Sequence, residues 1–210
     1  MTFALANLPP VTALSTALRT LEKDVGPAGS VILKMDKGGH WVYGADQTEV
    51  ESDSTWAVNP FSFIHGYIAW GDGEVLGEMM VPVTEPKPEL PPVPHGAKKG
   101  WEVQVGLSLK CLSGADEGIE VRYTTTSVGG KRAVNALGVA IAAQVESNQA
   151  TPVPVVSLAK DSYQHKSYGK IYTPVFAVKE WVGMDGAAAE AEQVEAKEEA
   201  AAPTRRRRAA

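Results

Sequence analysis

A nearly perfect alternation of apolar and polar residues at 101–113, WEVQVGLSLKCLS, constrains the fold more than any other feature of the chain. In an extended strand successive side chains point to opposite faces, so one face of this run is apolar and the other is polar. The apolar face holds Val103, Val105, Leu107, Leu109 and Cys111, and the polar face holds Glu102, Gln104, Ser108 and Lys110. The turn signal GADEG then leads into a second alternating run, IEVRYTTTS. Together these runs predict a β-hairpin over 101–127.

Further short runs rich in aromatic and β-branched residues indicate more strands. Two more hairpins are predicted, over 30–44 around the Lys37–Gly39 turn and over 61–83 around the Gly71–Gly73 turn. Two closing strands are predicted at 151–161 and 170–182, with the polar aromatic loop SYQHKSYG between them. Their prolines indicate sheet edges or bulges.

Two segments carry helical periodicity. Residues 11–24 place Val11, Leu14, Leu18 and Leu21 at three- and four-residue spacing, which predicts an amphipathic helix. Residues 128–147, VGGKRAVNALGVAIAAQVES, predict one internal helix. A proline-rich excursion at 82–96 is expected to be extended, because proline removes a backbone donor.

These elements predict a mainly β domain with minor α content. The hairpins, the internal helix and the final strand pair fit a small OB-like Greek-key barrel. The globular domain is assigned to 1–184, and the Ala/Glu-rich segment 185–210, which ends in Arg205–Arg208, is expected to be a disordered tail. The sequence leaves three roles open for the four arginines: contact with nucleic acid, contact with the tail's glutamates, and solubility.

Composition favours a folded cytoplasmic protein. Hydrophobic residues make up 44% of the chain and charged residues 21%, which is typical of a globular domain with a real core. Cys111 is the single cysteine, which fits a reducing compartment, and neither a signal peptide nor a membrane span is evident. Net charge is −5, so nucleic-acid binding would need a local basic strip and aromatic stacking.

Catalytic and metal-binding motifs are missing from the sequence. The segment VGGKR lacks the Ser or Thr that completes a phosphate-binding loop, because Arg132 stands there. The four histidines have no metal-ligand spacing, and no GxSxG motif is present. We therefore expect a non-enzymatic protein without metal or cofactor; an enzyme with a dispersed site has the least support.

The segment 160–172, KDSYQHKSYGKIY, carries the strongest binding signal. Aromatic rings interleaved with bases suit single-stranded nucleic acid, because rings stack on bases while cationic groups contact phosphates. The residues concerned are Lys160, Tyr163, His165, Lys166, Tyr168, Lys170 and Tyr172. A solvated loop whose tyrosines pack at its ends is the alternative interpretation.

Other aromatic and basic residues are weaker candidates for the same surface. Eight aromatics between Trp41 and Trp101 are potential stacking platforms; most should be core, and Trp41 and Trp70 are the two chosen as candidates. The basic candidates that would line one groove are Lys110, Arg122, Lys131 and Arg132. Ordinary pairing of Lys110 and Arg122 with Glu102 and Glu120 is the alternative.

Two stretches give the chain a resemblance to a known group of proteins. TWAVNPFSFIHGYIAWGDGEVLGEMMVPV (55–83) and DSYQHKSYGKIYTPVFAVKEWV (161–182), with the arginine-rich ending, resemble tailed-bacteriophage proteins associated with replication and recombination genes, some of which bind single-stranded DNA. The resemblance implies an OB-type barrel, no cofactor and DNA as ligand. One departure is that four arginines follow the acidic stretch, where such proteins commonly end in an acidic tip.

The leading hypothesis is therefore a phage protein that binds single-stranded DNA by stacking and phosphate contacts. This hypothesis adds phage or host replication and recombination proteins as partners, and it is compatible with a homo-oligomer. The second hypothesis is a protein-interaction module, an accessory or counter-defence factor, that uses the proline-rich linker or the hairpin edges.

Overall fold

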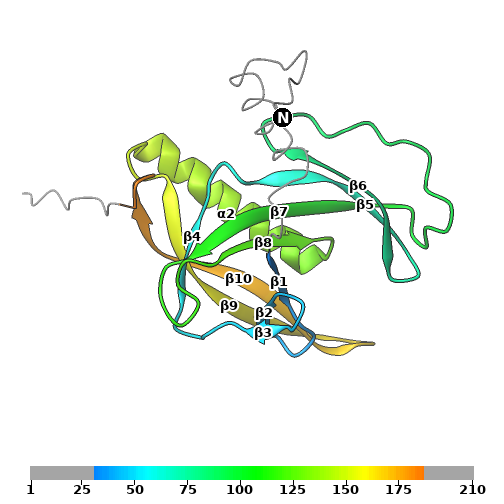
Figure 1. Cartoon of the computed structure of the whole chain (residues 1–210), viewed down its shortest axis with the longest axis horizontal. Helices are drawn as coiled ribbons and strands as arrows, with labels where there is room; N and C mark the ends of the chain where they lie inside the picture. The colour runs from blue at the N-terminus through cyan, green and yellow to red at the C-terminus, as the bar shows by residue number, and fades with distance from the viewer. Residues whose placement is uncertain (1–30, 187–210) are drawn as a thin grey trace, which may run out of the picture.

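The computed structural model describes residues 31–186, which form a mainly β fold around one internal helix (Figure 1). Ten strands make one mixed sheet, curled into a half-barrel, in the order β10-β9-β4-β7-β8-β1-β2-β3, with β5 and β6 branching from β7. The strands are β1 (Val31–Met35), β2 (Trp41–Tyr43), β3 (Thr48–Glu49), β4 (Thr55–Val58), β5 (Ile64–Gly71), β6 (Glu74–Pro82), β7 (Trp101–Cys111), β8 (Glu120–Thr125), β9 (Val153–His165) and β10 (Gly169–Val182). The predicted mainly β class is confirmed.

The alternating run at 101–113 forms the centre of the sheet. Strand β7 pairs with β8 along one edge, with Leu109 opposite Val121. Its other edge is shared, because β5 pairs with the first half of β7 and β4 with Leu109–Cys111. The hairpins predicted over 30–44, 61–83 and 101–127 are confirmed. Strand β4 was not predicted, and Gln104, assigned to the polar face, is buried and donates to Glu78 Oε1 at 2.5 Å.

The closing hairpin is longer than the sequence indicated. Strands β9 and β10 pair continuously from Val153↔Val182 to His165↔Gly169, with one irregularity near Val178. The prediction of a loop over 162–169 is therefore wrong for most of that segment, and only residues 166–168 form the turn. Pro174 lies on β10, which is an edge strand of the sheet, as expected for a proline within a sheet.

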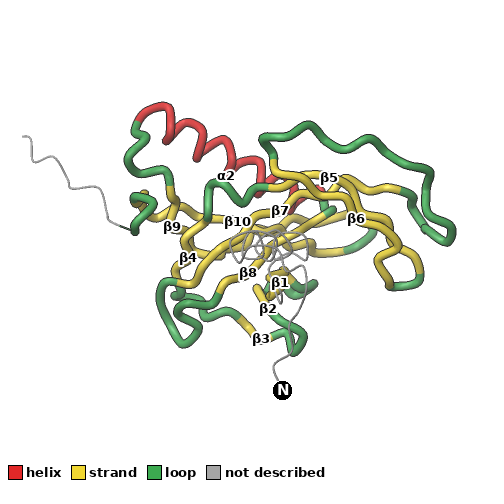
Figure 2. Tube along the Cα trace, turned by 45° about the horizontal axis from the view of Figure 1, so that its top comes forward, coloured by secondary structure: helices red, strands yellow, loops and turns green. Residues whose placement is uncertain are grey.

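Helix α2 (Val128–Ser147) lies along one side of the curled sheet, as Figure 2 shows. Its bounds match the predicted helix. Ser127 caps it, because the Ser127 Oγ accepts a hydrogen bond from the backbone N–H of Gly130 at 3.0 Å. Val134, Leu137 and Ile141 enter the same core cluster as Leu107 and Leu109 of β7. The helix therefore closes the concave face of the sheet.

The curl of the sheet brings β2 back to β9 and β10, although four strands separate β2 from β9 in the sheet order. The Trp41 Nε1 donates to the carbonyl oxygen of Ala159 at 2.9 Å, and the Trp41 ring packs against Phe176 with 5.5 Å between centroids. A contact between distant edges of one sheet requires strong coiling. The half-barrel is thus held together on this side by a buried indole.

Several expectations concern parts of the chain beyond these elements. The predicted helix over 11–24 and the predicted disordered tail beyond residue 186 lie outside the described residues. Residues 83–100 contain neither strand nor helix, as expected for the proline-rich excursion. Within 31–186 no helix has the length and apolar character needed to cross a membrane.

Candidate nucleic-acid interface

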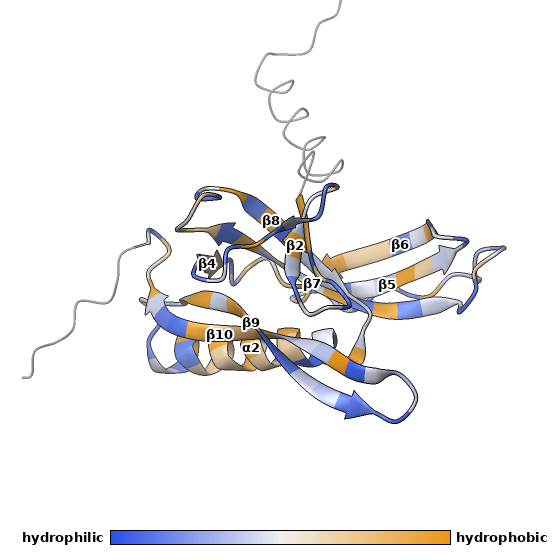
Figure 3. Ribbon diagram, turned by 90° about the horizontal axis from the view of Figure 1, so that it is seen from below, coloured by the Kyte–Doolittle hydropathy of each residue, from blue (hydrophilic) through white to orange (hydrophobic). Residues whose placement is uncertain are grey.

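The outer half of the β9–β10 hairpin is a two-stranded ribbon. Strand β4 pairs with β9 only at Val155–Ser157, so beyond Leu158 the backbone of β9 pairs only with β10. Figure 3 shows this part of the hairpin projecting from the body and coloured mostly as hydrophilic. The ribbon consists of the segment 160–172 that sequence analysis singled out, so the fold presents that segment to solvent on both faces.

The pairing register places two of the three tyrosines of this segment on opposite faces of the ribbon, and the third, Tyr168, lies in the turn. Tyr163 is opposite Ile171, whereas Tyr172 is opposite Ser162. Directly paired residues share a face and neighbouring residues alternate. Tyr163 and Tyr172 therefore lie on opposite faces, and the expectation that the tyrosines line one surface is corrected.

The Tyr172 face carries a concentrated positive charge. The Lys160 Nζ and the Lys170 Nζ lie 5.1 Å and 4.9 Å from the centroid of the Tyr172 ring, within cation–π range. Lys34 and Lys37 of the β1–β2 hairpin line a hollow of about 710 Å³ together with Lys170 and Tyr172. We name Lys34, Lys37, Lys160 and Lys170 the lysine cluster. Within 31–186 none of these four ammonium groups forms an ion pair.

One acidic residue, Asp36, lines this hollow, and its carboxylate is hydrogen-bonded to His40. The Asp36 carboxylate accepts from the backbone N–H of His40 at 2.8 Å and lies 3.2 Å from the His40 Nδ1. The backbone hydrogen bond from His40 lowers the pKa of Asp36. A lowered pKa keeps the Asp36 carboxylate ionised, so it offsets one of the four lysine charges. The cluster keeps a formal excess of positive charge beside an aromatic ring, which is the combination that a phosphate backbone and its bases require.

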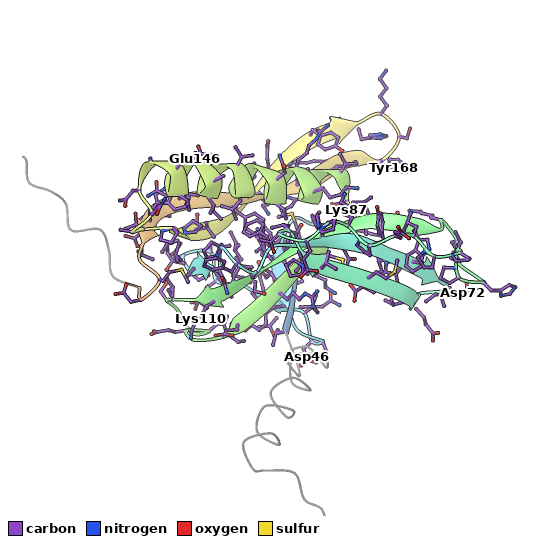
Figure 4. The ribbon with its side chains drawn as sticks, turned by 90° about the horizontal axis from the view of Figure 1, so that it is seen from above. Asp46, Asp72, Lys87, Lys110, Glu146 and Tyr168 are labelled. Atoms are coloured by element: carbon purple, nitrogen blue, oxygen red, sulfur yellow. The ribbon has the colours of Figure 1, made fainter. Side chains whose placement is uncertain are left out.

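The ribbon ends in an exposed pair of rings. Tyr168 is 79% exposed, and its ring lies 4.8 Å from the His165 ring at an interplanar angle of 33°. His165 is held in place by the backbone N–H of Ser167, which donates to its Nδ1 at 3.1 Å. Lys166 lies in the same three-residue turn as Tyr168, which Figure 4 shows at the end of the projecting hairpin. The two rings form an exposed stacking surface with a lysine in the same turn.

Tyr163 belongs to a second hollow on the opposite face, between the ribbon and the start of α2. It is 52% exposed and lines a cavity of about 490 Å³ together with Arg132, Asp161 and Thr173. The fold thus brings Arg132 near Tyr163, as a shared ligand surface would require. Lys131 lines a different groove on the other side of α2.

The remaining predicted site residues do not join this surface. Trp41 was expected to present its ring, but it is only 6% exposed because it belongs to the aromatic core with Tyr123 and Phe176. Trp70 is exposed, but it lies beside the turn between β5 and β6. Figure 4 labels Asp72 in that turn and shows it at the end of a different hairpin from the one that carries Tyr168.

Lys110 and Arg122 lie on the outer face of the sheet, since they alternate with the core residues Leu109, Val121 and Tyr123. The groove expected to join them to Lys131 and Arg132 is absent among residues 31–186, because α2 covers the inner face. The Lys110 Nζ instead pairs with the Glu120 Oε1 at 3.4 Å. The alternative of ordinary charge pairing is confirmed for Lys110.

Sequence reasoning missed Lys34 and Lys37 as members of the cluster. They belong to a hairpin more than 120 residues away in the chain, and only the curl of the sheet brings it beside the ribbon. In the described part of the chain, no three His, Cys, Asp or Glu side chains gather in a way that could hold a metal ion. Comparison with protein-family models, curated proteins and solved structures finds no match for this chain.

Proposed function

We propose that this protein is a non-enzymatic single-stranded DNA-binding protein that acts in phage DNA replication or recombination, with the β9–β10 ribbon as its binding arm. The observation that carries the proposal is the juxtaposition of exposed rings with unpaired lysines on this ribbon. Tyr168 and His165 supply the platform at the tip, and the lysine cluster surrounds Tyr172 below it.

Unpaired bases suit this arm better than a duplex. Stacking on a tyrosine ring requires an unstacked base face, which a single strand offers and a paired helix hides. Phosphate contacts alone would bind duplex equally well, so the rings decide the preference. The chain carries a net charge of −5, and affinity therefore depends on this local site.

Two finer parts of the proposal have separate support. An OB-like Greek-key barrel agrees with the curled mixed sheet, the parallel β1–β8 pair and the helix on the concave side. The role in phage replication or recombination is supported by the resemblance of 55–83 and 161–182 to tailed-phage proteins.

Fluorescence anisotropy with labelled oligonucleotides of about 20 nucleotides tests the proposal. Oligo-dT, the corresponding duplex and an RNA of the same length are titrated with the full chain at about 50 and 200 mM salt. We expect oligo-dT to bind more tightly than duplex and to weaken steeply with salt. Equal affinity for duplex and oligo-dT, or no binding at the lower salt, would overturn the proposal.

A second candidate function, protein interaction through the proline-rich segment, is favoured by one observation. Leu90 and Val93 are both exposed, on a segment that the Trp101 Nε1 fixes by donating to the carbonyl oxygen of Pro91 at 3.1 Å. A preformed extended segment with apolar side chains is a suitable ligand for an aromatic-lined groove. Pulldown from nuclease-treated host lysate, with a Leu90→Ala/Val93→Ala variant as control, separates the two functions. A protein partner that survives nuclease and is lost in the variant supports this candidate.

A further inference from the structure

An apolar groove runs along the side of α2 that faces away from the β9–β10 ribbon. The groove lies between α2 and the segment from Pro60 to His65, and its volume is about 670 Å³. Val83, which follows β6, and Val105 of β7 also line it. Phe63 and Ile141 form its floor, and Val139 on its wall is 62% exposed. Within 31–186 no segment covers this apolar surface.

Charge divides the groove into a positive and a negative end. Lys131, in the first turn of α2, and Lys87 mark one end, and Glu146, in the last turn, marks the other. Figure 4 shows Lys87 and Glu146 at opposite ends of the helix. None of the three forms an ion pair with another residue of 31–186.

We propose that the N-terminal segment 11–24 of the same chain binds in this groove as an amphipathic helix antiparallel to α2. Its apolar stripe has the composition and spacing that such a groove requires: Val11, Leu14, Leu18 and Leu21. Fourteen residues of helix extend about 20 Å, and the groove from Lys131 to Glu146 extends about 23 Å at the same rise per residue.

The charges of the segment set its direction. Glu22 and Asp24 lie at its C-terminal end with Lys23 between them. In a helix Glu22 follows Leu18 by four residues and so lies toward the apolar stripe, whereas Lys23 lies on the opposite side. An antiparallel helix therefore places Glu22 beside Lys87 and Lys131. The N-terminal half of the segment is uncharged up to Arg19 and lies toward Glu146. Antiparallel helices also align their dipoles favourably.

The connection to β1 is long enough for this arrangement. Leu33 of β1 is paired with Tyr123, whose hydroxyl lies against Gly130 at the start of α2. The described chain begins two residues earlier, at Val31 opposite Val121. Its start is therefore separated from the positive end of the groove by one neighbouring strand, two strand residues and one tyrosine side chain. Residues 25–30 extend up to about 20 Å when fully stretched, which is sufficient to join the two.

Disulfide trapping in the full chain tests the proposal. The variant Leu18→Cys/Val139→Cys places one thiol on the apolar stripe and one on the exposed groove wall, and Cys111 stays buried as an internal control. Thr16→Cys/Val139→Cys is the matched control, because Thr16 lies on the opposite side of a helix over 11–24. We expect an intramolecular cross-link that forms at least several-fold faster in the Leu18 variant. Equal rates, or dimers as the main product, would overturn the proposal, and dimers would identify a second copy as the occupant.

Limited trypsin digestion supplies a readout that does not depend on disulfide geometry. Val139→Glu should accelerate cleavage at Arg19 and Lys23 several-fold, because a carboxylate on the groove wall opposes docking of the apolar stripe. Val128→Glu is the control: Val128 is equally exposed, at 62%, on the same helix but outside the groove. Identical cleavage rates in the two variants and the unmodified chain would contradict the proposal.

Discussion

The indole Nε1 of Trp41 donates a hydrogen bond to the main-chain carbonyl of Ala159 at 2.9 Å, and this contact joins the two ends of the curled sheet. The ring is also packed among Tyr123 and Phe176, with 5.5 Å between centroids in each case. Ala159 lies at the base of the β9–β10 ribbon, one residue before Lys160. The orientation of the proposed binding arm therefore depends on a tryptophan in the core.

Trp41→Phe should destabilise the protein modestly. It keeps most of the ring but removes the donor, and loss of one hydrogen bond costs about 1 kcal/mol of unfolding free energy. Trp41→Ala should cost about 3–5 kcal/mol, because it also leaves a cavity in the aromatic core. Urea denaturation measures both, with Trp70→Phe as the exposed control. Equal stabilities for the Trp41→Phe and Trp70→Phe variants would contradict the anchoring role.

Local patterns predicted most of the fold because they are set by neighbouring residues. The period-two alternation of β7 and β8 and the turn signals around Gly39 and Gly73 define the hairpins, and Ser127 begins α2. Strand β4 is only four residues long, too short to show a period. For the outer ribbon the sequence predicts a loop, because both faces of the ribbon are solvated and neither shows an apolar stripe.

The candidate site was only partly predictable, since its assembly depends on long-range contacts. The segment 160–172 was identified from its own composition. The burial of Trp41 and the addition of Lys34 and Lys37 both follow from the curl of the sheet, which no local pattern specifies. For Lys110 the sequence leaves binding and charge pairing open, because the choice depends on the pairing of β7 with β8, which places its Nζ 3.4 Å from the Glu120 Oε1.

Tyr168→Ala should weaken oligo-dT binding without affecting stability. Its ring is 79% exposed, and removing one stacking platform costs about 1–3 kcal/mol, or roughly 5- to 150-fold in Kd. Tyr168→Phe keeps the ring and should bind nearly as well. Phe61→Ala, an exposed ring far from the ribbon in sequence, serves as the control in the same anisotropy titration. A Phe61 effect as large as the Tyr168 effect would argue against a specific platform.

The lysine cluster should determine the salt dependence of binding. Each phosphate contact contributes about 0.7 to the slope of log K against log salt for a single strand, so Lys37→Gln/Lys160→Gln/Lys170→Gln should lower the slope by about 2. The matched control is Lys98→Gln/Lys99→Gln/Lys110→Gln, which removes the same charge from three lysines that already form ion pairs. Their partners are Asp72, Glu102 and Glu120, respectively. An equal loss of slope in both variants would show that binding follows net charge alone.

Two buried tyrosines, Tyr43 and Tyr123, make the free energy of unfolding sensitive to alkaline pH. The short hydrogen bond from the Tyr43 hydroxyl to the Asp116 Oδ1 raises the pKa of Tyr43 to about 12, and burial raises the pKa of Tyr123 to about 12. Both values exceed the ordinary tyrosine pKa of about 10. Between about pH 10 and pH 12, therefore, the folded state keeps the hydroxyl protons of Tyr43 and Tyr123, whereas the unfolded state has released them.

Stability should accordingly be constant with respect to these groups below about pH 10 and fall as the pH rises toward 12. The slope is about 1.4 kcal/mol per pH unit for each tyrosine that is protonated only in the folded state. Urea denaturation between about pH 9 and pH 11.5 measures the decline, and tyrosinate absorbance follows ionisation in parallel. Tyr123→Phe should remove one such contribution and make the decline shallower by about that amount. An unchanged slope in this variant would mean that Tyr123 ionises equally readily in both states, which its 3% exposure in the core argues against.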